Sequence, residues 1–168
     1  MSQAHEKRQA EAYPTKLVKG EHDATRSQGD PNYYQYTRSK PRIEEVAGVW
    51  RLDLSASDWK PAVGVVKTPT IELKLDGTST VRDIPDVWNW DNRHVVGGYD
   101  SGDGTWSLRQ DQQWGVVHVS LPKVNGMAPG RSYMLFPTGQ STPYTILARI
   151  GDPDEGRALT FRREQPAP

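Results

Sequence analysis

The chain has 168 residues, which suits one domain, and its 15 glycines and 13 prolines indicate many turns. Lys and Arg together number 21, as do Asp and Glu, so no overall field favours nucleic acid or an anionic membrane surface. The chain contains no cysteine, which excludes disulfides, thiolate metal sites and cysteine nucleophiles.

Residues 1–45 are predicted to form a flexible polar arm, because they contain neither Trp nor Phe and cannot bury enough surface to offset their ordering entropy. Tyr33, Tyr34 and Tyr36 stand out in this arm, since tyrosine combines a large contact area with a polar tip. They either pack on the protein's own domain or contact a protein partner. Both alternatives remain open at this stage.

The first residues contain no apolar segment of the kind that begins a signal peptide, and no stretch approaches the ~20 apolar residues that cross a bilayer. If Met1 is the native start, we expect a cytoplasmic protein without membrane contact. A secreted protein would give the same pattern if the N-terminus had been processed or engineered.

From Val46 onward, apolar and polar residues alternate with a period of two and turn residues recur at short intervals, which is typical of an antiparallel all-β domain. Strands joined by hairpins form an up-and-down meander whose edges need protection. We therefore expect a closed antiparallel β-barrel of about eight strands over residues 46–164, with a tail at 165–168. The predicted strands are 48–54, 71–75, 78–84, 105–109, 114–121, 131–136, 144–150 and 157–163, with an uncertain segment at 88–96.

The alternation also assigns faces to individual residues. In the first predicted strand Leu54 shares the inward face of Trp50, and in the second Leu75 shares the inward face of Ile71. Gly77 then supplies the positive φ that a tight hairpin turn needs.

Gly48-Val49-Trp50 opens the first strand and Phe161-Arg162-Arg163 closes the last one. These segments resemble the first and last signatures of lipocalins and their calycin relatives. The resemblance implies a small bacterial barrel of lipocalin-like type in which Gly48, Trp50 and Arg163 are structural. It further implies that Arg163 lies over the Trp50 indole as a cation–π contact.

A candidate ligand site lies between the predicted third and fourth strands. Trp88, Trp90 and His94 share one face if this segment is extended, and Tyr99 follows them. Such an aromatic wall with one titratable group suits a small apolar or planar ligand. The alternative is a short helical turn that plugs the barrel end, with both tryptophans as packing.

Other chemistry has less support in the sequence. The carboxylate-bearing segments 99–104 and 152–155 are expected to be loops. Their carboxylates could in principle bind calcium, but Asx turns are the favoured explanation for them. Histidine metal-site spacings, serine-nucleophile motifs and phosphate-binding loops are absent, so we expect no metal and no cofactor. An acid–base pair of Asp91 and His94 is the remaining enzymatic alternative.

The first functional hypothesis is thus a non-enzymatic binding protein, since an eight-stranded barrel is just wide enough to hold one small ligand. The alternative is a cytoplasmic interaction module, such as a toxin-neutralising immunity-like protein or an assembly subunit. The tyrosine-bearing arm and the lack of a catalytic motif motivate that alternative.

Overall fold

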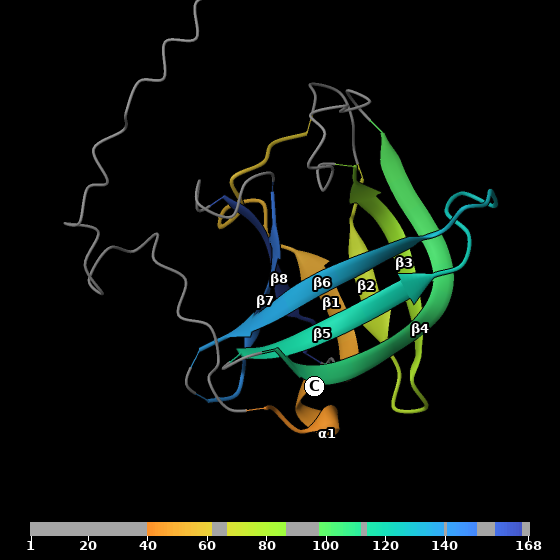
Figure 1. Ribbon diagram of the computed structural model, residues 1–168. Helices are drawn as coiled ribbons and strands as arrows, with labels where there is room; N and C mark the ends of the chain where they lie inside the picture. The colour runs from red at the N-terminus through yellow and green to blue at the C-terminus, as the bar shows by residue number, and fades with distance from the viewer. Residues whose placement is uncertain are drawn as a thin grey trace, which may run out of the picture.

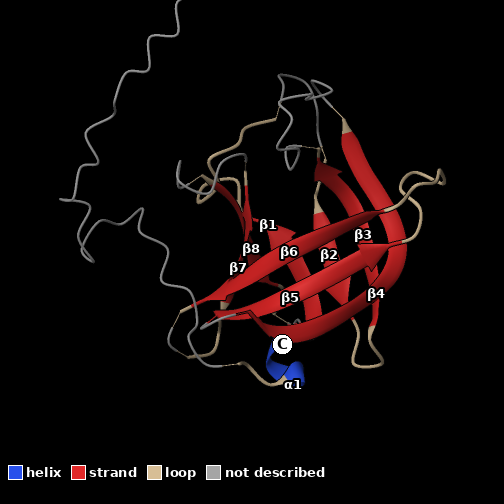
Figure 2. Cartoon of the chain, in the orientation of Figure 1, coloured by secondary structure: helices blue, strands red, loops and turns tan. Residues whose placement is uncertain are grey.

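The chain folds into a closed antiparallel barrel of eight strands that pair in chain order, as the computed structural model shows (Figures 1 and 2). The structure describes residues 40–61, 67–86, 98–111, 114–139, 141–150 and 157–165. These ranges contain a short helix, α1 (Ile43–Val46), and the strands β1 (Gly48–Leu52), β2 (Thr70–Leu73), β3 (Thr78–Pro85), β4 (Tyr99–Asp111), β5 (Trp114–Leu121), β6 (Arg131–Thr138), β7 (Thr145–Arg149) and β8 (Ala158–Arg163). The predicted fold class is confirmed.

The barrel closes where β1 pairs with both of its neighbours. Trp50 lies opposite Ile71 of β2 on one side and opposite Arg163 of β8 on the other. Pairing of the first strand with the last removes the free edges that an open meander would present.

Two inward assignments at strand ends are wrong. Leu54 is 38% exposed and Leu75 is 67% exposed. The first difference arises because β1 ends at Leu52 and the Asp53 carboxylate then accepts hydrogen bonds in a turn. The second arises because Leu75 lies in the β2–β3 turn, where Gly77 has the expected positive φ of 83°.

The segment 99–104, which was expected to be a loop, is the first half of the 13-residue strand β4. The glycines of this segment do not form a turn; they let β5 and the residues after it approach β4 closely. A Cβ on Gly104 would lie 2.0 Å from the Ser120 carbonyl oxygen, and one on Gly102 would lie 2.5 Å from the Lys123 carbonyl oxygen. The predicted segments 88–96 and 152–155 lie outside the described residues.

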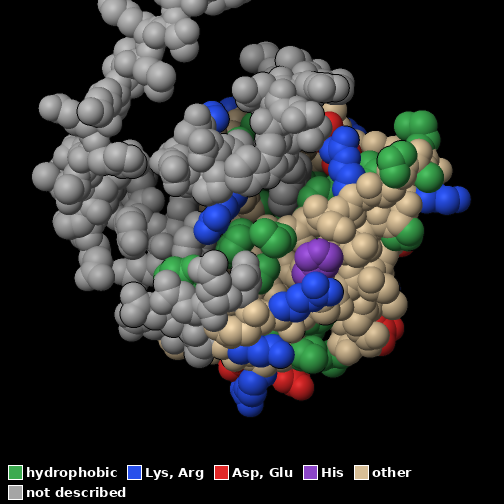
Figure 3. All heavy atoms as spheres, viewed as in Figure 1, with side chains coloured by type: hydrophobic (Ala, Val, Ile, Leu, Met, Phe, Trp, Pro, Cys, Tyr) green, Lys and Arg blue, Asp and Glu red, His purple; other side chains and the backbone are tan. Residues whose placement is uncertain are grey.

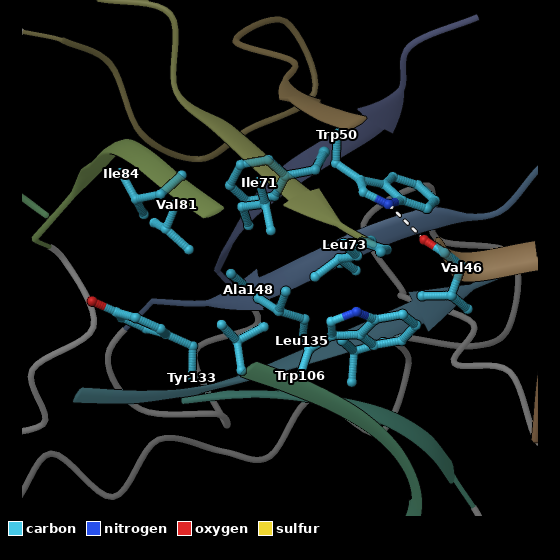
Figure 4. Packing of buried hydrophobic residues seen from close by; sticks show 14 of the residues in the cluster. Val46, Trp50, Ile71, Leu73, Val81, Ile84, Trp106, Tyr133, Leu135 and Ala148 are labelled. Atoms are coloured by element: carbon cyan, nitrogen blue, oxygen red, sulfur yellow. Dashed lines mark hydrogen bonds between the residues drawn. The ribbon is translucent and has the colours of Figure 1, made fainter. Parts of the chain in front are cut away.

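The packed domain begins before residue 46, because α1 covers one end of the barrel. Val46 is fully buried, and its carbonyl oxygen accepts a 2.8 Å hydrogen bond from the Trp50 indole. The Trp106 indole donates to the Lys74 carbonyl oxygen at 2.7 Å. Figure 4 shows Val46, Trp50 and Trp106 together at one end of the core and Tyr133 at the other. We call the end beside α1 the helix-capped end.

Arg163 makes a different contact from the one the resemblance implied. Its guanidinium donates to the Ala47 carbonyl oxygen and lies over Gly48, where a Cβ would come within 2.7 Å of Nε. The carbonyl oxygens that follow α1 have no acceptor role in the helix itself, so they attract a cation. The cation–π contact with Trp50 is thereby replaced by hydrogen bonds to the backbone.

We expect Trp50→Ala to lower the free energy of unfolding by about 3–5 kcal/mol, because it leaves a cavity at the helix-capped end. Urea denaturation measures the change. Met134→Ala is the control, since Met134 is 50% exposed and its loss should cost below about 0.5 kcal/mol. A cost below ~1 kcal/mol for Trp50→Ala would contradict its place in the core.

Gly104→Ala should also destabilise the barrel, by about 1–3 kcal/mol or more, because the new methyl group would meet the β5 backbone. Thr105→Ala, at the adjacent exposed position, is the matched control. Equal melting temperatures for the two variants would show that β5 does not lie so close to β4.

Candidate functional site

Four polar side chains meet at the end of the barrel opposite α1. Asp86 follows β3, Asp100 belongs to β4, and Arg131 and Tyr133 belong to β6. Arg131 Nη1 donates to Asp86 Oδ1 at 2.5 Å and to Asp100 Oδ2 at 2.7 Å. The Tyr133 hydroxyl donates to the same Asp100 oxygen at 2.8 Å. We call these four residues the polar cluster.

A β-bulge in β3 brings Asp86 into this cluster. Val81 pairs with Gly102, but Ile84 pairs with Asp100, so β3 holds one extra residue at this point. Alternation from Val81 would turn Ile84 and Asp86 outward. The bulge shifts the phase, and both are buried, at 1% and 8% exposure.

Asp83 is the residue that stabilises the bulge. Its φ is 52°, a left-handed conformation that Asp adopts more readily than most residues. Its backbone N–H donates to Ser101 Oγ at 2.9 Å, and its carboxylate pairs with Lys67 Nζ at 2.5 Å. These contacts join the end of β3 to β4 and to the segment that precedes β2.

Regular alternation places the two β6 members of the cluster. Arg131 shares a face with the buried residues Tyr133 and Leu135, whereas Met134 points outward. The Arg131 side chain is 37% exposed, while the side chains of Asp86 and Asp100 are 8% and 4% exposed. The guanidinium therefore reaches from the solvent to two buried carboxylates.

Burial and the neighbouring charged groups together shift the pKa values of the cluster. It raises the pKa of Asp100, although the Tyr133 hydrogen bond and the Arg131 charge oppose the shift. Burial also raises the pKa of Tyr133, and the neighbouring Asp100 charge adds to this rise. Hydrogen bonding to Asp86 raises the pKa of Arg131. Tyr133 and Arg131 are therefore hydrogen-bond donors at neutral pH, and Asp100 is more easily protonated than an ordinary aspartate.

Asp100 keeps unused hydrogen-bonding capacity. Its Oδ2 accepts both bonds of the cluster, whereas Oδ1 accepts none from the part of the chain that the structure describes. A carboxylate oxygen has lone pairs for about two hydrogen bonds. Oδ1 is therefore an acceptor at the end of the barrel with no partner among the described residues, on a side chain that is 4% exposed.

Apolar side chains continue the interior from the cluster towards the middle of the barrel. The space between them is not wide enough for a water molecule. The residues around this space are Ile71, Val81, Ile84, Val119, Tyr133 and Leu135. The described part of the interior is thus closely packed beneath the polar cluster.

Tyr99 is the one predicted ligand residue within the described part of the chain, and it lies at the same end as the cluster. It pairs with Pro85, and its ring meets the Trp59 ring edge-on with centroids 6.3 Å apart. Lys67 Nζ lies 5.0 Å from the centre of the Tyr99 ring. One aromatic ring and one ammonium group therefore lie beside the Tyr99 ring.

The other predicted contact residues, Trp88, Trp90, Asp91 and His94, lie outside the described residues, as do the arm residues Tyr33, Tyr34 and Tyr36.

Sequence reasoning missed the polar cluster. The available signal was Arg131, which shares the inward phase of Tyr133 and Leu135. Asp100 similarly shares the phase of Trp106. Opposite charges at inward positions near strand ends would have indicated a buried ion pair.

No protein-family model matches the chain, and neither a curated protein nor a solved structure does so. Within the described ranges, no group of three or more His, Asp or Glu side chains is placed to hold a metal ion. None of the helices in those ranges has the length and apolar character needed to cross a bilayer. Function is therefore inferred from the geometry of the barrel.

Asp100→Asn should change how stability depends on pH. Because the pKa of Asp100 is raised from its ordinary 3.8, the folded state retains a proton that the unfolded state releases above that pH. Wild-type stability relative to the variant should thus be greatest at acid pH and fall as pH rises from about 3.8 to the raised pKa. Urea denaturation over a pH series measures the difference.

Asp103→Asn is the matched control, because hydrogen bonds from Thr80 and Arg82 lower the pKa of the exposed Asp103. Its stabilising effect should be present above pH 3.8 and be lost as pH falls through the lowered pKa. If the Asp100 difference instead grew with rising pH, its ion pair with Arg131 would outweigh the cost of burying the charge.

Proposed function

We propose that the chain is a non-enzymatic binding protein of lipocalin-like type, which holds a small molecule at the end of the barrel opposite α1. The polar cluster of Asp86, Asp100, Arg131 and Tyr133 carries this proposal. It combines converging polar groups with an apolar interior, which is the usual composition of a small-molecule site.

Stability alone gives a poor account of the cluster. Removing charges from water costs several kcal/mol for each ion, and well-packed apolar side chains are often as stabilising as a buried ion pair, or more so. The helix-capped end is closed by Val46, Trp50 and Trp106, whose polar atoms bond only to backbone carbonyl oxygens. Buried groups with shifted pKa values at the other end instead favour recognition of a ligand.

The free acceptor at Asp100 indicates one property of the ligand. An N–H or O–H group of a bound molecule would complete the hydrogen bonding of Oδ1. The Tyr133 ring and the buried Ile84 supply apolar contacts beside it. The geometry supports a ligand with an apolar or planar body and one hydrogen-bond donor.

The position of the ligand follows from the packing of the interior. Since the space beneath Tyr133 does not admit water, the ligand would lie at the barrel end rather than deep inside. The segment that carries Trp88, Trp90 and His94 leaves β3 after Asp86 and rejoins β4 at Tyr99, so both of its anchors are at this end.

Titration calorimetry with indole, tryptamine and naphthalene tests the proposal. We expect the two probes with an N–H donor to bind more tightly than naphthalene. Asp100→Asn should weaken their binding by about 10-fold or more, the effect of one hydrogen bond to a charged group. Tyr133→Phe should weaken it less, because it removes only a donor that orients Asp100.

Asp103→Asn is the control here too, since this residue lies on the outside of the barrel and should leave affinity unchanged. If none of the probes bound, and native mass spectrometry detected no copurified small molecule, the proposal would be wrong. Equal effects of Asp100→Asn and Asp103→Asn would exclude the polar cluster as the site.

A further inference from the structure

The polar cluster carries more negative than positive charge. Asp86 and Asp100 share one guanidinium, that of Arg131, whose Nη1 donates to their carboxylates at 2.5 and 2.7 Å. The fourth member, Tyr133, is uncharged at neutral pH, because burial raises the pKa of its hydroxyl. When both carboxylates are ionised, two negative charges therefore face one positive charge.

The negative charges also lie deeper than the positive one. The side chains of Asp86 and Asp100 are buried, whereas that of Arg131 is partly exposed. Water therefore screens the guanidinium better than it screens the carboxylates. Lys67 brings an ammonium group to the same end of the barrel, but this group is paired with the Asp83 carboxylate at 2.5 Å. Lys67 thus does not offset the charge of the cluster.

This excess of buried negative charge is unfavourable in the absence of a further cation. One guanidinium needs only one carboxylate, so the second carboxylate adds a desolvation cost that Arg131 alone does not offset. Burial raises the pKa of Asp100, and the neighbouring Asp86 charge adds to the rise. Asp100 Oδ1, moreover, accepts no hydrogen bond from the described residues. Both features favour a hydrogen-bond donor that is positively charged.

We propose that the ligand of this site is an organic cation, whose ammonium group donates a hydrogen bond to Asp100 Oδ1. The inference rests on the proposed function, because it specifies the class of molecule that is held at the barrel end. A protonated amine supplies an N–H donor and a positive charge in one group, and hydrogen bonds between ionised partners are the stronger ones. The Tyr133 ring and Ile84 would contact its apolar body.

Other charged ligands suit the cluster less well. An anion could pair with Arg131 but would lie beside two carboxylates, which would repel it. A metal ion needs several protein ligands, and the described ranges bring no three His, Asp or Glu side chains together around one point. An amine complements the excess charge and needs only one or two acceptors.

Binding of a cation should depend on pH through Asp100. An ammonium group favours the ionised carboxylate, so binding releases a proton wherever the free protein holds one on Asp100. Because the pKa of Asp100 is raised from 3.8, affinity should fall as pH is lowered from about 7 through the raised pKa. The groups of the described chain that face Asp100 are Asp86, Arg131 and Tyr133. The last two keep their protons over this range, since their pKa values are raised as well.

The first test compares three indoles of similar size by titration calorimetry on the wild-type protein. Tryptamine, tryptophol and indole-3-acetate carry an ammonium, a hydroxyl and a carboxylate group at corresponding positions. We expect tryptamine to bind about 10-fold or more tightly than tryptophol, and indole-3-acetate to bind most weakly. Equal affinities for tryptamine and tryptophol would overturn the inference and leave the proposed function standing. If none of the three bound, the inference would be overturned, and the search for a copurified molecule would then decide the proposed function.

The second test removes one negative charge at a time. Asp86→Asn and Asp100→Asn should each reduce the preference for tryptamine over tryptophol by about 10-fold. Asp103→Asn, which removes the same charge from the outside of the barrel, should leave the preference unchanged. The ratio of two affinities does not depend on the fraction of protein that is folded, and the comparison on the wild type needs no variant. An unchanged preference in both cluster variants would overturn the inference.

The third test follows the same preference over a pH series in the wild type and in His118→Gln. His118 lies on the outside of β5, and Figure 3 shows the histidine at the surface of the barrel. The preference for tryptamine should therefore decline with falling pH to the same extent in both proteins. A preference that stayed constant over this range, or a decline that the His118 substitution abolished, would overturn the assignment to Asp100.

Discussion

Closure of the barrel depends on the junction of α1, β1 and β8. Trp50 is buried, and its indole N–H is bonded to the Val46 carbonyl oxygen, which fixes α1 across the end of the barrel. Arg163, from the last strand, reaches over Gly48 to the Ala47 carbonyl oxygen. The helix, the first strand and the last strand are held together at one point, and without it the sheet would have two free edges.

This junction also explains why the two barrel ends differ. At the helix-capped end, aromatic side chains fill the interior and bond only to backbone oxygens. The opposite end has no comparable helix within the described ranges, and Arg131 bridges two aspartates there. The bulge before Ile84 makes this possible, because it turns Asp86 inward with little disturbance of the rest of β3. The β-bulge in β3 thus makes the end opposite α1 polar, whereas the helix-capped end is apolar.

Much of the fold could be predicted because alternation is a direct consequence of a sheet with one buried face. Predictions from alternation failed at two kinds of position: where a β-bulge changes the phase of a strand, and where glycine lets two strands approach closely. Asp86 was not placed inside, because the only trace of the bulge in the apolar pattern is that Val81 and Ile84 stand three residues apart. The segment 99–104 was predicted to be a loop, although its Gly102 and Gly104 make room for β5 and the residues that follow it. Arg163 was correctly expected beside Trp50, with which it pairs across β1 and β8. Its guanidinium bonds to the Ala47 carbonyl oxygen rather than lying over the Trp50 indole, and alternation does not predict that contact.

The interior of an eight-stranded barrel has room either for side chains or for one small ligand. Here Trp50 and Phe161 are at most 1% exposed and occupy part of that room, so the ligand that we propose would be recognised at the end of the barrel. The groups at that end are polar and close to the solvent, and Asp100 Oδ1 accepts no hydrogen bond from the described residues. Selectivity would therefore come from hydrogen bonding at the rim, while the packed interior beneath it holds Tyr133 and Asp100 in fixed positions. A rigid support of this kind lowers the entropic cost of binding, because the site need not be ordered by the ligand.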